Sequence, residues 1–296
     1  MRGIIYALLA MVSYSSTPTF TQVGYKGGIQ TNTLLFSRHL VSFVFLLPTL
    51  LKKDSFSAIG KKQLPGILIL CACSIVGNIT FNYAYHYLPN MVAVSVSLSY
   101  IVFVLIIELI MGREKYTRTR GVVILLTFIS MVIIAFPGGS AGIDLKAFAV
   151  GLFASFMYSA QLVFINSRIM RSVPANILLL TSVVPIMIVS FFWCIAGGQP
   201  LLPSNGTQWF AILCLGTIGV IAARGLFYKA VRIIGASTAS IIDSLEPFSS
   251  AVLGYVLLRQ MPTIFTAIGS LILCFSVILL LKERSKRSIL SESHEA

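Results

Sequence analysis

Ten runs of about 20 mostly apolar residues divide this sequence, and they constrain its fold more than any other feature. An α-helix needs a run of about that length to cross the hydrocarbon core of a bilayer. A water-soluble core cannot bury so many segments that are apolar on all sides. The sequence therefore predicts an all-α integral membrane protein with ten transmembrane helices. The expected spans, one to ten, are 3–23, 33–51, 64–86, 91–111, 119–136, 147–166, 175–196, 209–229, 237–258 and 264–281.

The net charge of +13 could suggest a nucleic-acid partner, but the distribution of that charge argues against one. No basic stripe with interleaved aromatic residues is present, and the basic residues stand at the ends of the apolar runs. Only 10% of the residues are charged, against about 25% in an average soluble domain. Lipid is therefore the expected surrounding of most of the chain, and nucleic acid is excluded as a partner.

The basic residues also predict the orientation of the chain, because cytoplasmic loops of membrane proteins carry an excess of Lys and Arg. If the N-terminus is cytoplasmic, 17 of the 22 basic residues lie in inside segments and 3 lie in outside loops. The other two, Arg38 and Arg224, fall inside spans. A missed or added helix would reverse every later loop and destroy this split. We therefore expect both termini in the cytoplasm of a plasma membrane, most simply the inner membrane of a bacterium.

The two halves of the chain resemble each other. Tyr14-Ser15 in span one recurs as Tyr158-Ser159 in span six, and Tyr83 in span three recurs as Tyr228 in span eight. The offset of about 145 residues predicts one five-helix repeat over 1–145, a second over 146–282, and a cytoplasmic tail over 283–296. Because five is an odd number of crossings, the second repeat must be inverted. Many secondary transporters are built this way, with a midplane site between the repeats.

With these features the chain resembles the EamA-type transporters of the drug/metabolite transporter superfamily over nearly its full length. The resemblance rests on five features of the chain: the small and aromatic first span around Tyr14 and Pro18, Arg38 in span two, Gly112-Arg113-Glu114 after span four, Leu245-Glu246-Pro247 in span nine, and the two sets of five helices. It implies gradient-linked movement of small metabolites, frequently efflux, through a central cavity.

The chain also departs from the family pattern at three places. Tyr14 replaces the usual tryptophan, the proline expected near Tyr100-Ile101 is absent, and Gln260 replaces the glutamate that would mirror Glu114. The expected fold is unaffected by these changes. They do prevent a substrate from being transferred from any one relative.

Asp243 and Glu246 are the main site candidates. They lie three residues apart and share one face of span nine, and Glu246 is close to the predicted midplane. An ionisable group at a helix centre costs about 2.5–3.5 kcal/mol on insertion scales, so its presence needs a reason. Pro247 removes a backbone donor beside them. We expect Glu246 to couple transport to a proton or cation, whereas Asp243 could instead neutralise Arg224 across a hairpin turning near Ile233-Ile234.

Other polar residues could line the same site, each with a structural alternative. Arg224 could bind a substrate carboxylate and Arg38 could do so from span two, although either could extend to the membrane surface. Glu108 is expected at the inner interface. The uncharged candidates, which could equally serve helix packing or interhelical hydrogen bonds, are Tyr14, Tyr83, Tyr158, Tyr228, Gln161 and Asn82.

These observations favour a secondary transporter over an enzyme or a channel. The sequence has no H-E-x-x-H motif, no G-x-x-x-x-G-K-[ST] loop and no cysteine or histidine spacing typical of a metal site, so neither catalysis nor a cofactor is expected. Nothing marks a selectivity filter. Because both signs of charge are available, we expect amino acids or related zwitterions as substrates. Amines or quaternary ammonium compounds are the alternative, and the assembly is left open, with a homodimer as one arrangement.

Overall fold

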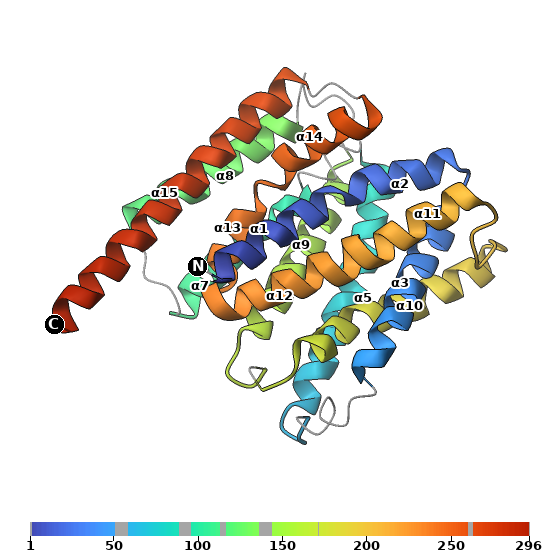
Figure 1. Cartoon of the computed structure of the whole chain (residues 1–296), viewed down its shortest axis with the longest axis horizontal. Coiled ribbons are helices and arrows are strands. Elements are labelled where there is room, and N and C mark those ends of the chain that lie inside the picture. The colour runs from blue at the N-terminus through green and yellow to red at the C-terminus, as the bar shows by residue number, and fades with distance from the viewer. Residues whose placement is uncertain are drawn as a thin grey trace.

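The computed structural model of the chain describes residues 2–50, 59–88, 96–112, 117–135, 144–170, 172–259 and 263–295, and these residues form helices joined by turns and short loops. Figure 1 shows long helices packed into one bundle, with the two termini at one end of the molecule. No strand occurs among the described residues. An all-α fold is therefore confirmed.

The helices coincide with the predicted spans. Spans two, three, five, six, seven and ten correspond to α3 (Thr31–Leu50), α5 (Leu64–Tyr87), α8 (Arg118–Ala135), α9 (Leu145–Ile165), α10 (Ala175–Ala196) and α15 (Ile264–Glu295). Span four contains α7 (Tyr100–Ile110), and its first residues, like Arg113, Glu114 and Gln260, lie outside the described part of the chain.

Besides span four, which is interrupted at Ser99, three spans are not single regular helices within the described residues. Span one consists of α1 (Arg2–Ser15) and α2 (Thr17–Lys26), and span nine consists of α13 (Ala236–Asp243) and α14 (Glu246–Leu258). Span eight runs through α11 (Gly206–Cys214), the wider π-helical turn η1 (Leu215–Ala222) and α12 (Ala223–Ile234).

Within the described residues, four helical segments are long and apolar enough to cross a membrane: Leu64–Phe81, Leu145–Ile165, Ala175–Ala196 and Gly206–Ile234. The breaks in spans one and nine leave pieces that are each too short to meet this criterion alone.

Large apolar side chains cover the outside of the bundle, including Leu68, Phe192 and Leu271, which are 61–67% exposed. Serine and threonine side chains, by contrast, are buried inside it. This arrangement is the one that a lipid solvent favours.

The helix pairings are symmetric under exchange of the two halves. Span one packs on span eight (α1 on α12), and the equivalent pair, span six on span three (α9 on α5), is also in contact. Spans two and seven (α3 and α10) pair with each other, as do spans five and ten (α8 and α15), which run side by side in Figure 1. A duplicated architecture of two five-span repeats accounts for this pattern.

Candidate functional site

The helix breaks in spans one, four and nine gather near the centre of the bundle. Span one breaks at Ser16, span four at Ser99, and span nine at Ser244 and Leu245. The break in span one contacts span nine, because the hydroxyl of Ser250 on α14 donates to the carbonyl of Ser15 over 3.2 Å. Interrupted helices at membrane depth leave backbone groups unpaired, and such groups are tolerated where they line a site or are buried in protein.

Asp243 lies at the end of α13 and is 3% exposed. Its Oδ2 accepts a hydrogen bond from the hydroxyl of Tyr100, which reaches across from α7. Its Oδ1 is buried and has no hydrogen-bond partner within the described chain. A buried carboxylate normally has all of its hydrogen-bonding capacity used. One face of Asp243 therefore remains available to a substrate cation or a proton.

The expected ion pair between Arg224 and Asp243 does not form. Among the described residues no carboxylate oxygen lies within 4.0 Å of the Arg224 guanidinium. The chain turns at Gly235, which has a φ of 84°, and not at Ile233-Ile234. Arg224 thus stands 11 residues from the turn and Asp243 only 8, a difference of about 4.5 Å along the helix axis. Tyr100 takes the position beside the carboxylate.

Arg224 instead faces the tyrosines and Arg38. It interacts electrostatically with Tyr14 and Tyr158, and it repels Arg38 on α3. Arg38 Nε is buried and has no hydrogen-bond partner in the described part of the chain. The neighbouring His39 is fully buried and its Nδ1 pairs with the Leu35 carbonyl over 2.7 Å. Two guanidinium groups that have no carboxylate partner among the described residues are suited to bind an anionic group.

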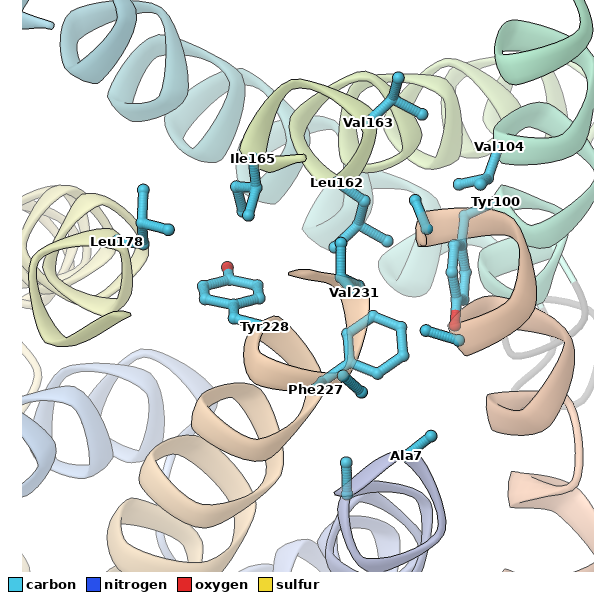
Figure 2. Packing of buried hydrophobic residues seen from close by; sticks show 14 of the residues in the cluster. Ala7, Tyr100, Val104, Leu162, Val163, Ile165, Leu178, Phe227, Tyr228 and Val231 are labelled. Carbon is cyan, nitrogen blue, oxygen red and sulfur yellow. The ribbon is translucent and has the colours of Figure 1, made fainter. Parts of the chain in front are cut away.

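Three of the predicted tyrosines surround this region, together with Tyr100. The Tyr158 ring packs edge to face on Tyr100, with ring centroids 4.9 Å apart. The Tyr14 ring packs in the same way on Phe227 at 6.0 Å. Tyr228 is buried and its hydroxyl lies 3.5 Å from that of Ser182. Figure 2 shows that Phe227 and Tyr228 leave α12 on different sides, with the Phe227 ring toward Tyr100 and the Tyr228 ring toward Ile165 and Leu178.

The hydroxyl of Tyr14 lies at the middle of these groups. It interacts electrostatically with Tyr158, Arg224, Tyr228 and Asp243. It is near the hydroxyl of Tyr158, yet it has no partner at hydrogen-bonding geometry among the described residues. Tyrosine faces and hydroxyls of this kind can contact both a cation and a polar substrate group.

Glu246 begins α14, directly after the break, and is partly buried. The positive end of the helix dipole favours a carboxylate at this position. Glu246 interacts electrostatically with Asp243 and with Tyr100. The interruption expected from Pro247 is thus observed, and it places two acidic groups on either side of one helix break.

Two predicted residues lie away from this centre. Tyr83 on α5 stacks on Tyr87 with ring centroids 4.8 Å apart, in a separate apolar cluster near Leu88. Gln161 on α9 is buried and donates to the Ser74 hydroxyl on α5 over 2.8 Å. Gln161 thus makes the interhelical hydrogen bond that was the predicted alternative to a place in the substrate site. The side chain of Asn82 lies outside the described residues.

Two residues of the region were not expected there. Tyr100 was absent from the predicted site, although the repeat offset of 146 between Gly112 and Leu258 places it opposite Glu246. Glu108 was expected at the inner membrane interface, and it lies near the end of α7, beside the start of α13. It is 2% exposed and its Oε2 accepts the backbone N–H of Ser237 over 3.0 Å. The helix α13 begins with a buried first turn, whose backbone N–H groups need such an acceptor, and the hydropathy pattern of α7 does not reveal this.

The fold and the sequence both have known counterparts. A crystal structure of a protein with 15% sequence identity superposes with a TM-score of 0.78, covering 95% of this chain and 98% of the other. No curated protein sequence matches the chain. The EamA-like transporter family matches it twice, over residues 1–136 and 145–282, in agreement with the symmetric pairing of the two halves. Together these matches cover nearly the whole sequence, and the chain belongs to the EamA-like transporter family of multi-pass membrane proteins.

Proposed function

We propose that this protein is a secondary-active transporter that exports amino acids or related zwitterions, driven by a proton or ion gradient. Membership of a family of small-molecule transporters supports the general activity. The observation that carries the substrate class is the separation of charge in the candidate site. Arg224 and Arg38 stand near each other without a carboxylate partner in the described chain, whereas Asp243 and Glu246 flank the break in span nine.

A zwitterion fits both groups at once. Its carboxylate would bind between the guanidinium groups, and its ammonium group would approach Asp243 Oδ1, which lacks a donor among the described residues. The tyrosines between them would contact the rest of the molecule through their rings and hydroxyls. A substrate with only one charge would leave the opposite group unpaired in a poorly hydrated site, which is costly.

Glu246 is the proposed coupling residue. A carboxyl group beside a helix break can bind a proton while the site faces one side of the membrane and release it on the other. Substrate and proton would then alternate at Asp243 and Glu246, as exchange across an inverted-repeat transporter requires. In this reading the ten spans cross the membrane with both termini in the cytoplasm.

The test of substrate class is transport into proteoliposomes. Neutral amino acids, their decarboxylated amines and their deaminated acids are supplied as three matched sets, with and without an imposed pH gradient. Saturable, gradient-dependent uptake of the zwitterions alone is expected. Preferential uptake of the amines would instead support the second candidate, a transporter of amines or quaternary ammonium compounds, which the tyrosines around Asp243 favour.

The proposed orientation has a separate test in intact cells. Single cysteines at Lys61 and Arg118 should be shielded from an impermeant thiol reagent, because both positions fall in segments predicted to be cytoplasmic. A cysteine at Ser204 should react. Labelling of Lys61→Cys from outside would contradict the orientation without touching the substrate class.

A further inference from the structure

The helix α13 (Ala236–Asp243) is a separate element within span nine. All eight of its residues are buried. It begins after Gly235, which adopts a φ of 84° that other residues rarely adopt, and it ends at the break before Glu246. A helix of this length contributes few internal hydrogen bonds. Its position in the bundle must therefore be set by contacts with its neighbours.

One neighbouring helix, α7, holds α13 at both of its ends. At the beginning of α13, the backbone N–H of Ser237 donates to Glu108 Oε2 over 3.0 Å. At the end of α13, Asp243 Oδ2 accepts from the hydroxyl of Tyr100. Tyr100 and Glu108 are eight residues apart on α7, a rise of about 12 Å, which matches the length of α13. The two helices are thus antiparallel and are fastened at two points.

The first contact is more than a standard helix cap. The residue before a helix is usually a serine, threonine or asparagine, whose side chain accepts a hydrogen bond from the first turn. Before α13 this residue is Gly235, which has no side chain to do so. The acceptor comes from the other repeat, and it is an acidic group that is 2% exposed. Burying a carboxylate costs free energy unless its negative charge is stabilised by a partner. The positive end of the α13 helix dipole provides this stabilisation. The position equivalent to Glu108 in the second repeat is Gly254, so the second repeat has no corresponding carboxylate cap.

The same end of the molecule is tightly packed. A Cβ atom on Gly3 of α1 would stand 2.4 Å from Ile234 Cγ2, directly before the turn into α13. The guanidinium of Arg232 donates to the carbonyls of Met170 and Val173, which join the turn to the segment between α9 and α10. The start of α13 is therefore enclosed by elements of both repeats.

We propose that Glu108 is a positioning residue that fastens the start of α13 to α7, so that Asp243 at the other end is held in the site and this end of the bundle stays closed. The proposal rests on the proposed function, because it assigns Asp243 to the substrate site. When Glu108 is removed, the hydrogen bond between Tyr100 and Asp243 still holds the end of α13, whereas the backbone N–H of Ser237 loses its acceptor on α7 and the first turn can separate from the bundle.

Accessibility of the start of α13 tests the proposal without reference to any substrate. The five native cysteines are replaced, and Ser237→Cys supplies one buried thiol while keeping the backbone N–H that Glu108 accepts. The rate of alkylation of purified protein by a hydrophilic methanethiosulfonate is then measured. Glu108→Ala should raise this rate at least fivefold. Glu108→Gln retains an acceptor oxygen of the same reach and should stay within twofold of the parent. Glu283→Ala, which removes an acid that accepts from the Thr117 hydroxyl over 2.8 Å, should leave the rate unchanged.

Transport by the same variants, without Ser237→Cys, gives the second measurement. Glu108→Ala should raise the KM for the substrate of the parent protein, and Glu108→Gln should restore it. Equal alkylation rates in Glu108→Ala and the parent would overturn the proposal. If Glu108→Ala does not fold, Glu108→Asp keeps the charge but shortens the reach, and an unchanged rate in that variant overturns it equally. If the parent protein moves no zwitterion, the proposed function fails while the alkylation rates still decide the role of Glu108.

Discussion

Spans four and nine occupy equivalent places in the two repeats, yet they carry different chemistry. Both are interrupted, at Ser99 in the first and at Ser244 and Leu245 in the second. After the interruption the first repeat has Tyr100, whereas the second has Glu246 followed by a proline. The duplication supplied two similar broken helices. One now provides acidic groups, and the other provides the neutral hydroxyl that bonds to Asp243.

This difference indicates a division of roles between the repeats. The acidic groups at the helix break, Asp243 and Glu246, are both in the second repeat, as is Arg224. The first repeat contributes Tyr100, Tyr14 and Arg38, which hold or face them. A symmetric scaffold thereby carries an asymmetric site, and substitutions at equivalent positions should have unequal effects. Four variants, three single and one double, test these roles.

The largest effect is expected from Glu246→Gln. This change keeps the shape of the side chain but removes its capacity to exchange a proton. Gradient-driven accumulation should be abolished, whereas exchange of labelled for unlabelled substrate at equal pH should persist, because exchange needs no net proton movement. Uptake into proteoliposomes with and without a pH gradient measures both. Full gradient-driven transport by Glu246→Gln would show that the acid is structural. Tyr100→Gln, at the equivalent position, should impair both modes alike.

The second effect concerns charge recognition by Arg224. A hydrogen bond to a charged group contributes about 1.5–3 kcal/mol, so Arg224→Gln should raise the KM for a zwitterion roughly 10- to 150-fold. The amine that lacks the substrate carboxylate should be affected far less, because it never uses the guanidinium. Competition assays with the matched zwitterion and amine give the comparison. Equal losses for both compounds would argue that Arg224 serves packing.

The sequence predicted the fold far better than it predicted the contacts of the site. Hydropathy located the helices because a run of apolar residues marks a span wherever the chain packs. Hydropathy could not show which side chain contacts Asp243, because that depends on the exact position of the turn before α13. The turn is at Gly235 and not at the predicted Ile233-Ile234, so Arg224 and Asp243 lie at different depths. Tyr100 and Glu108 were missed for a related reason. Both act on α13, an element far away in the sequence, and only the repeat offset pointed to Tyr100.

The third effect is a loss of stability in Tyr100→Phe. Without the hydroxyl, Asp243 loses the donor to Oδ2 while it remains buried. Leaving a buried acceptor unsatisfied costs about 1–3 kcal/mol, so the protein should unfold at a lower temperature in detergent. Tyr83→Phe is the matched control, because Tyr83 stacks on Tyr87 outside this region and should be nearly silent. An unchanged melting temperature in Tyr100→Phe would mean that another donor replaces the hydroxyl.

The smallest effect is expected at the interface of α5 and α9, which joins the two repeats away from the acidic groups. Gln161 Nε2 donates to the Ser74 hydroxyl over 2.8 Å, and both side chains are buried. Hydrogen bonds between membrane helices contribute on average only about 0.6 kcal/mol, since the alternative states also find partners. Gln161→Leu combined with Ser74→Ala removes both partners together and leaves neither unsatisfied, so stability should change by less than about 1 kcal/mol. Transport should keep its gradient dependence and its KM. A large rise in KM in this double variant would place Gln161 in the substrate site after all, and would extend that site to the interface of α5 and α9.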